Sequence, residues 1–197
     1  MTRVAFQGEL GAFSELAIAQ CWGDAAEPVP CREFVDVTHA VATGVVDAGV
    51  LPVENIIIGA IDAARAALDR PDIVITGETS VSIQLLLLAR PGTTLSDVRE
   101  VASHPAALGQ CAMLLAAYPD WRIVVAYDTA GAARDLQRAP DRHRAVIASA
   151  AAATHYGLCA LLSNVADRAD NMTRFVTIRR ASRITARVTA RAFRRAP

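Results

Sequence analysis

The sequence has no lysine and few cysteines. Every basic side chain among its 197 residues is an arginine. The four cysteines, at positions 21, 31, 111 and 159, form no CxxC pair and no other closely spaced pair. This spacing fits neither a disulfide-bonded scaffold nor a zinc site, and it favours free thiols in a reducing compartment.

Long apolar runs are also missing. The most apolar stretch, Val81 to Ala89, includes Ser82 and Gln84, and it is far shorter than the ~20 residues that a membrane-spanning helix needs. Near the N-terminus, Glu9 and Glu15 interrupt any apolar core of a signal peptide. We therefore expect a soluble, cytoplasmic protein with no membrane partner.

Acidic residues are absent from the C-terminal end of the chain. Seven arginines lie between Arg179 and Pro197, which leaves 13 arginines against 20 acidic residues in 1–178 and makes the formal net charge of the whole chain zero. An acidic body with a short basic tail and no interleaved aromatics is poor support for nucleic-acid binding. We expect residues 181–197 to be a solvated basic tail, with no nucleic-acid partner.

Hydrophobic residues make up 53% of the chain and charged residues 20%, which excludes intrinsic disorder. Apolar strand patterns alternate with helical patterns, and repeated β-α units of this spacing predict mostly parallel sheets covered by helices. The expected strands are 3–7, 29–34, 49–53, 73–75, 81–89, 122–126, 145–148 and 173–179, with a further strand ending at Ser103. The expected helices are 14–21, 36–44, 60–69, 105–118, 129–138 and 150–156, the first with Ser14 as its N-cap.

Turn-forming residues interrupt this order near the middle of the chain, at Gly77–Ser80 and at Pro91–Gly92. We interpret the interruption as the passage between two lobes, one formed by 1–78 with 163–180 and the other by 79–162. Loops from both lobes would then surround a ligand in the cleft between them.

Two short motifs follow expected strands in the first part of the chain. The segment Gly8–Ser14 joins a strand to a helix, where free backbone amides are able to hold an anion, although it lacks the GxGxxG pattern of dinucleotide sites. The segment Leu51–Asn55 (LPVEN) places Glu54 and Asn55 at a strand end. Open α/β sheets bind ligands at such strand ends. Each motif alone is equally compatible with an ordinary turn or helix cap.

Two further motifs occur in the second part. Ser103-His104-Pro105 is followed by Gln110, but there is no GxSxG elbow, and adjacent Ser and His do not have the geometry of a hydrolase triad. Asn171-Met172-Thr173-Arg174-Phe175 begins the last strand. An arginine beside a threonine hydroxyl at such a junction can bind a carboxylate and donate a proton.

Taken together and in this order, these segments resemble the prephenate dehydratase family. The matching pieces are FQGELGAFSE, LPVEN, SHPAALGQC, the DTAGAA run at Asp128–Ala133, and NMTRF after YGL. They extend from Val4 to about Ile178, and their order makes the resemblance specific. It implies an α/β fold of two lobes, similar to a type II periplasmic-binding-protein, with the active site in the inter-lobe cleft.

The resemblance also implies the reaction. Prephenate loses carbon dioxide and its ring hydroxyl and becomes phenylpyruvate, with no cofactor and no metal, in a protein expected to be a homodimer. The TRF motif of the family corresponds to Thr173-Arg174-Phe175. The resemblance implies that Thr173 assists the departure of hydroxide and that Arg174 holds a carboxylate or orders the site. The positions expected to bind substrate are Asn55, Ser103, Gln110, Glu54, Phe175 and Gly11.

Several positions depart from the family pattern. Ile56 stands where members usually have Ser or Thr after the Asn of PxEN, Ala106 replaces a Gln, and Gln84 replaces a His. We expect Ile56 to remove a hydrogen bond and change the shape of the pocket. Only 17 residues follow Arg180, too few for the phenylalanine-binding ACT domain that most members carry, so we expect no ACT-based feedback in this chain.

Alternatives to a prephenate dehydratase remain open at this point. One is a dehydratase that prefers arogenate, and another is a prephenate decarboxylase of specialised metabolism that does not aromatise its product. Retention of the complete TRF motif argues against the decarboxylase. A third alternative, of a different class, is a ligand-binding protein without catalytic activity, which would be stabilised by prephenate but would not consume it.

Overall fold

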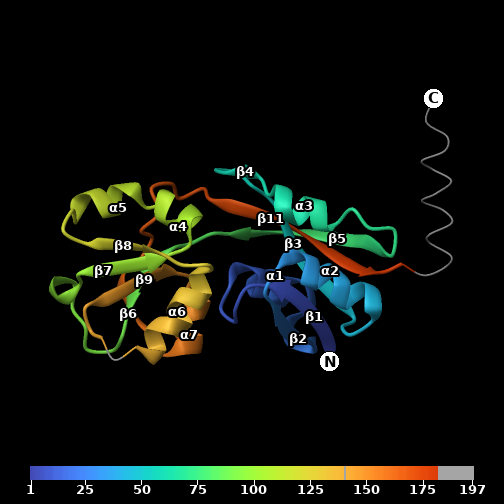
Figure 1. Ribbon diagram of the computed structural model, residues 1–197, viewed down its shortest axis with the longest axis horizontal. Helices are drawn as coiled ribbons and strands as arrows, with labels where there is room; N and C mark the ends of the chain where they lie inside the picture. The colour runs from blue at the N-terminus through green and yellow to red at the C-terminus, as the bar shows by residue number, and fades with distance from the viewer. Residues whose placement is uncertain (140, 182–197) are drawn as a thin grey trace.

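Two β-sheets, one in each half of the molecule, organise the fold (Figure 1). The computed structural model describes residues 1–139 and 141–181. The first sheet has the strand order β2-β1-β3-β11-β5, with β4 beside β3, and the second has the order β10-β6-β9-β7-β8. The prediction of a two-lobed α/β fold is therefore confirmed.

The first lobe contains β1 (Thr2–Gln7), β2 (Ala26–Cys31), β3 (Ala48–Asn55), β4 (Gly59–Ala60), β5 (Ile73–Ser82) and β11 (Met172–Arg180), with helices α1 (Phe13–Trp22), α2 (Phe34–Thr43) and α3 (Asp62–Ala67). The second contains β6 (Leu86–Ala89), β7 (Glu100–Ser103), β8 (Arg122–Val125), β9 (Arg144–Ala148) and β10 (Cys159–Leu162), with helices α4 (Pro105–Gly109), α5 (Ala112–Ala117), α6 (Thr129–Arg138) and α7 (Ala150–Tyr156). Two 3-10 turns, η1 (Gly23–Ala25) and η2 (Leu95–Asp97), complete the elements. The chain passes between the sheets at 83–85 and again at 163–171.

Both faces of the first sheet are covered, which explains why its central strands are apolar at consecutive positions. Val4 and Phe6 of β1 belong to one buried cluster with Ile18 of α1. Ala5, between them, belongs to a second cluster with Val37 and Val41 of α2. The alternation of side chains along β1 thus supplies two cores from one strand.

The sheets are mixed, not mostly parallel as the sequence predicts. β1 pairs in parallel with β2 and β3, and β7 pairs in parallel with β8 and β9. In contrast, β11 runs antiparallel to both β3 and β5, while β6 runs antiparallel to β9 and β10. The antiparallel strands adjoin the passages between lobes, where the chain enters a sheet without a crossover helix.

The predicted strand 81–89 and the predicted turn at Gly77–Ser80 are both wrong. Gly77–Ser80 lies inside β5, which continues to Ser82, and the apolar run is divided between the end of β5 and the separate strand β6. The run is continuous in sequence because both its ends are buried, although in different sheets. The predicted helix 105–118 is likewise divided into α4 and α5.

Helix ends follow their capping residues. Asp128 caps α6 by accepting the N–H of Gly131 at 3.1 Å, and Ser149 caps α7 by accepting the N–H of Ala152 at 2.9 Å. The predicted N-cap at Ser14 is wrong, because α1 already begins at Phe13 and Ser14 is buried within it. Within the described parts of the chain, no helix is both long and apolar enough to cross a membrane. The basic tail predicted at 181–197 falls outside those parts, except for Ala181.

The two lobes approach closely at the loop between β1 and α1. Gly11 has φ +88°, and a Cβ added there would lie 2.6 Å from the Cα of Ala152 in α7. The Ser149 hydroxyl donates to the Gly11 carbonyl at 2.6 Å. Only glycine combines this backbone conformation with so close a contact, so the position joins the lobes.

Candidate functional site

A cavity of about 900 Å³ lies where the two lobes meet. Its walls come from the β1–α1 and β2–α2 loops, the ends of β3 and β11, the passage at 83–85, helix α4 and the start of α6. Of the residues predicted as site residues, Asn55, Gln110, Thr173 and Phe175 line it. Strand ends and loops from both lobes therefore form one site.

A chain of side-chain hydrogen bonds runs along this cavity. The Asn55 amide nitrogen donates to the Thr173 hydroxyl oxygen and to the Asn171 amide oxygen, both at 2.8 Å. The Asn171 nitrogen in turn donates to the Gln110 amide oxygen at 2.8 Å. Asn55, Asn171 and Thr173 are buried, with exposed fractions of 4%, 1% and 7%. In a buried setting such a connected network fixes the orientation of each member.

The direction of donation determines which protons remain for a ligand. The Asn55 amide oxygen accepts the backbone N–H groups of Ile57 at 2.9 Å and Ile58 at 3.2 Å, so its nitrogen must point toward Thr173. Because the Thr173 oxygen already accepts a hydrogen bond, its own proton is available to donate, and no described residue accepts it. The Gln110 nitrogen is left as a second donor in the same way.

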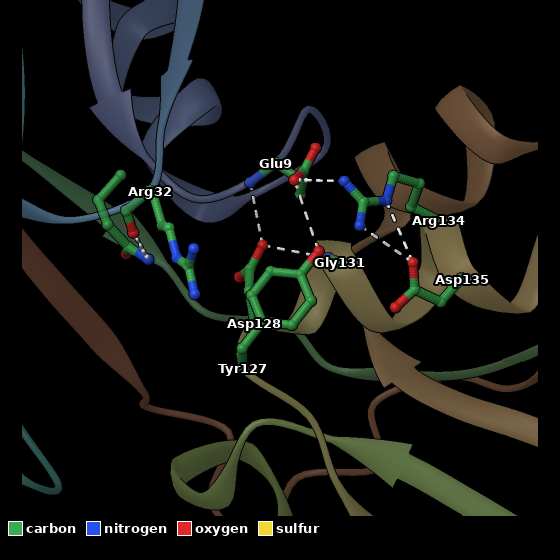
Figure 2. Close-up of polar contacts among 8 residues, drawn as sticks. Glu9, Arg32, Tyr127, Asp128, Gly131, Arg134 and Asp135 are labelled. Carbon is green, nitrogen blue, oxygen red and sulfur yellow. Dashed lines mark hydrogen bonds and ion pairs between the residues drawn. The ribbon is translucent and has the colours of Figure 1, made fainter.

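Charged groups also line the cavity, among them Glu9, Asp128 and Arg134 (Figure 2). The Glu9 carboxylate pairs with the Arg134 guanidinium at 2.5 Å, and Arg134 also pairs with Asp135 at 3.1 Å. The Glu9 backbone N–H donates to the Asp128 carboxylate at 3.0 Å. Figure 2 shows Glu9 between Asp128 and Arg134, so the β1–α1 loop is tied to α6 by both its backbone and its side chain.

Partial loss of hydration raises the pKa of two groups beside this ion pair. Desolvation raises the pKa of Tyr127 to about 12, and the nearby Glu9 carboxylate adds to the effect. Desolvation also raises the pKa of Asp128, although backbone N–H donors, first among them that of Glu9, offset part of it. At neutral pH the Tyr127 phenol is protonated, and its hydroxyl donates to the Glu9 carboxylate at 3.5 Å (Figure 2).

Arg174 and Glu54, predicted to act in the site, do not line the cavity. Side chains alternate along a strand, so Thr173 and Phe175 face the cavity while Arg174 faces the other side of the sheet. There Arg174 binds the carboxylates of Glu54 at 2.8 Å and Glu78 at 3.3 Å. The hydrogen bond from Arg174 lowers the pKa of Glu54. Arg174 thus links β11 to β3 and β5, and it does not line the cavity.

Ser103, Gly11 and Ile56 are also displaced from their predicted roles. The buried Ser103 hydroxyl donates to the Ile147 carbonyl at 2.6 Å and so links β7 to β9. Gly11 joins the lobes, as described above. Ile56 is 53% exposed and lies outside the lining. Ile58 and Ile61 form the cavity wall here instead. The expectation that the Ile56 side chain changes the shape of the pocket is therefore wrong.

The polar residues that the sequence did not assign to the site include Asn171, which bonds to Gln110, and the lining residues Glu9, Arg32, His104, Tyr127, Asp128 and Arg134. For Asp128 the sequence does contain a signal. An Asp that follows a strand and directly precedes a helical pattern is a typical helix N-cap, and Asp128 caps α6 by accepting the Gly131 N–H. Asn171 belongs to the NMTRF segment, but the sequence alone indicates no role for its side chain. No local pattern indicates Arg32 or Tyr127.

Metal ligands do not gather within residues 1–139 and 141–181, where no group of three or more His, Cys, Asp or Glu side chains is placed to hold an ion. All four cysteines are free thiols, and burial raises the pKa of Cys111 to about 12. Cys31 lines the cavity, and burial raises its pKa as well, so its reactive thiolate form is disfavoured.

Comparison with known proteins gives a consistent result. The chain is 39% identical to arogenate dehydratase/prephenate dehydratase 2 of Arabidopsis thaliana over 178 residues, which are 90% of this chain and 46% of that protein. It is 35% identical to the bifunctional chorismate mutase/prephenate dehydratase of Escherichia coli K12 over 181 residues, again 90% of this chain and 47% of the other. The chain thus spans less than half the length of these relatives.

Solved structures of similar fold and sequence include a member of the same family. Prephenate dehydratase of Arthrobacter aurescens, in complex with L-Phe, superposes with a TM-score of 0.83 at 29% identity, over 91% of this chain and 60% of that one. GqqA, described as a novel type of quorum quenching acylase, superposes with a TM-score of 0.82 at 34% identity, over 91% of this chain and 64% of the other. The family model of prephenate dehydratase matches residues 4–183. The chain therefore belongs to the prephenate dehydratase family.

Proposed function

We propose that the protein converts prephenate to phenylpyruvate by decarboxylative dehydration. The observation that carries the proposal is the Thr173 hydroxyl, which faces the cavity and is held as a hydrogen-bond donor by Asn55. Membership of the family supports the same reaction.

The reaction needs a donor at the leaving group more than a nucleophile. The carbon–carbon bond to the ring carboxylate breaks and carbon dioxide leaves. The released electron pair moves through the ring and expels hydroxide from the opposite carbon, which gives an aromatic ring. Negative charge therefore develops on the departing oxygen, where the Thr173 hydroxyl and the Gln110 amide are the available donors. Each such donor contributes roughly 10²–10³ in rate when it is aimed at developing charge.

The remaining wall suits the ring of the substrate. Ile83, Leu85 and Phe175 form an apolar surface beside Thr173, and Phe175 is only 2% exposed. An apolar wall keeps water away from the ring, so that the departing oxygen is hydrogen-bonded by the positioned donors and not by solvent. The cavity volume of about 900 Å³ is ample for a small dicarboxylate.

The test is replacement of Thr173 by Val, which removes the hydroxyl at nearly constant shape. We expect kcat for prephenate to fall about 10²–10³-fold, with little change in KM, and Thr173→Ser to recover much of the rate. Thr177→Val is the matched control, since Thr177 lies on the same strand and bonds to Thr76 outside the cavity. Unchanged turnover in Thr173→Val would refute the assigned role.

Product analysis separates this function from the alternatives. Phenylpyruvate formed from prephenate, above a control without enzyme, supports the proposal, and phenylalanine formed from arogenate would move the preference to that substrate. Loss of prephenate without an aromatic product would indicate a decarboxylase. Stabilisation by prephenate without turnover would indicate a binding protein. An acylase function is not favoured, because the hydroxyl of Ser103, beside His104, is already donated to a backbone carbonyl.

We further propose that the protein is a homodimer. The edge strand β8 supports this, since Ile123 and Val125 are 43% and 68% exposed on it. Exposed apolar edges are common pairing sites between chains. Sedimentation equilibrium measures the state directly, and a monomer at micromolar concentration would contradict the proposal.

A further inference from the structure

Two arginines, Arg32 and Arg134, line the cavity, and among the described residues only the Arg134 guanidinium has a partner. Arg134 is neutralised by Glu9 and Asp135. Arg32 also lines the cavity, yet its guanidinium makes no hydrogen bond or ion pair with any residue in 1–139 or 141–181. A cation beside a ligand cavity with no internal partner is available to an anionic ligand.

The backbone at Arg32 is held firmly although the guanidinium is not. The Arg32 carbonyl accepts the Gln7 amide at 3.4 Å, and the neighbouring Cys31 carbonyl accepts the Gly8 N–H at 2.9 Å. On the other side, the Glu33 N–H donates to Asp36 at 3.0 Å within the capping box that starts α2. These contacts fix the position from which the side chain projects.

Figure 2 shows where that side chain goes. The guanidinium extends from the β2–α2 loop toward the side of the cavity that carries Asp128, and no interaction joins it to the Asp128 carboxylate. Arg32 belongs to the first lobe and Asp128 to the second. A ligand between the lobes would therefore meet the guanidinium from the cavity side.

We propose that Arg32 is a specificity-determining residue that binds the side-chain carboxylate of the substrate. This rests on the proposed function, in which the substrate carries two carboxylates. The ring carboxylate loses its charge as carbon dioxide forms, so a cation paired with it would stabilise the ground state more than the transition state. The side-chain carboxylate keeps its charge throughout, and a guanidinium can bind it through two parallel hydrogen bonds.

The assignment has a consequence for substrate choice. Prephenate and arogenate share the side-chain carboxylate and differ only at the carbon beside it, so Arg32 contributes to the binding of both. It selects for ligands that carry this carboxylate, and it selects against neutral ring compounds of the same shape.

The experiment measures binding of two ligands that differ by that one group. Phenylpyruvate retains the side-chain carboxylate, whereas phenylacetone replaces it with a methyl group. Calorimetric titration of both into the wild-type chain, Arg32→Gln and Arg32→Lys gives the coupling between Arg32 and the carboxylate. Arg138→Gln is the control, because Arg138 ends α6 outside the cavity and its replacement changes the net charge equally.

We expect Arg32→Gln to weaken phenylpyruvate binding roughly 10- to 100-fold, with Arg32→Lys between it and the wild type, and Arg138→Gln unchanged. Phenylacetone binding should be the same in all four proteins. With prephenate, Arg32→Gln should raise KM by a similar factor at nearly constant kcat, because the ion pair persists in the transition state.

Two results would overturn the proposal. One is equal affinity of the wild type and Arg32→Gln for phenylpyruvate. The other is an equal loss for phenylacetone, which would mean that the substitution damages the cavity instead of removing an ion pair. Because neither ligand has to react, these titrations decide the role of Arg32 even if the wild type fails to turn over prephenate, which would refute the proposed function instead.

Discussion

Replacement of Gly11 by Ala should destabilise the protein more than a positive φ alone explains. The added Cβ would lie 2.6 Å from the Cα and 2.9 Å from the backbone nitrogen of Ala152. Carbon atoms in contact are normally about 3.5–4.0 Å apart, so one lobe must shift by about 1 Å. Overlap of this kind costs typically 1–3 kcal/mol, and the unfavourable backbone conformation adds about 1–2 kcal/mol. The two costs together amount to about 2–5 kcal/mol, and we expect a loss of about 3 kcal/mol in the free energy of unfolding.

Gly92 provides the matched control. Its φ is +81°, close to the +88° of Gly11, but a Cβ there would meet no atom within 4 Å. Gly92→Ala should therefore show the cost of the backbone conformation alone, about 1–2 kcal/mol. The difference between the two variants isolates the close contact between the lobes.

The assay is urea denaturation followed by circular dichroism, with thermal melting as a second measure. For a domain of this size 1 kcal/mol shifts Tm by roughly 2–4 °C, so Gly11→Ala should melt about 6–12 °C below the wild type. If the two variants lose the same free energy, the lobes are not packed against each other at Gly11 and the reasoning is wrong.

Two further predictions concern the polar groups of the cavity. Asn55→Asp should reduce kcat for prephenate at least 100-fold, because a carboxylate at that position accepts the hydrogen bond of the Thr173 hydroxyl and faces the Asn171 oxygen at close range. A rate within tenfold of the wild type would contradict the donor assignment. Asp128→Asn should alter the pH dependence of stability, because burial raises the pKa of Asp128 above 3.8 and its charge therefore opposes folding at neutral pH. As the pH falls through the raised pKa, the folded protein takes up the proton before the unfolded protein does, and this cost disappears. The stability advantage of Asp128→Asn over the wild type should therefore be largest near pH 7 and shrink toward pH 3.8. Denaturation at several pH values would contradict this if the difference in unfolding free energy stayed constant.

Helices were predictable from sequence where a capping residue marks their start. The predicted ranges for α6 and α7 agree with the structure to the residue, because Asp128 and Ser149 precede them and bond to their first free N–H groups. The run from Val81 to Ala89 is wrongly predicted as one strand, because apolar character indicates that residues are buried but not in which sheet they lie. Nothing local in that run records that the chain leaves one sheet and enters another at 83–85.

The candidate site was predictable as a set of segments but not side chain by side chain. Thr173 and Arg174 are adjacent in the recognised TRF motif, yet strand alternation sends them to opposite faces of the sheet. Ser103 lies in a matching segment too, but it bonds to the neighbouring strand. Arg32 was missed because only the tertiary fold places the β2–α2 loop beside the cavity.

One buried cluster contains Val4, Phe6 and Ile18 from the first lobe together with Leu87 and Ile147 from the second. Hinge opening of the kind seen in many two-lobed binding proteins would expose this shared core, and each large apolar side chain brought into water would cost about 1.5–3 kcal/mol. The groups that line the cavity are thus held in place by a core that both lobes share. Substrate entry and product exit would then depend on local movements at the cavity mouth, not on separation of the lobes.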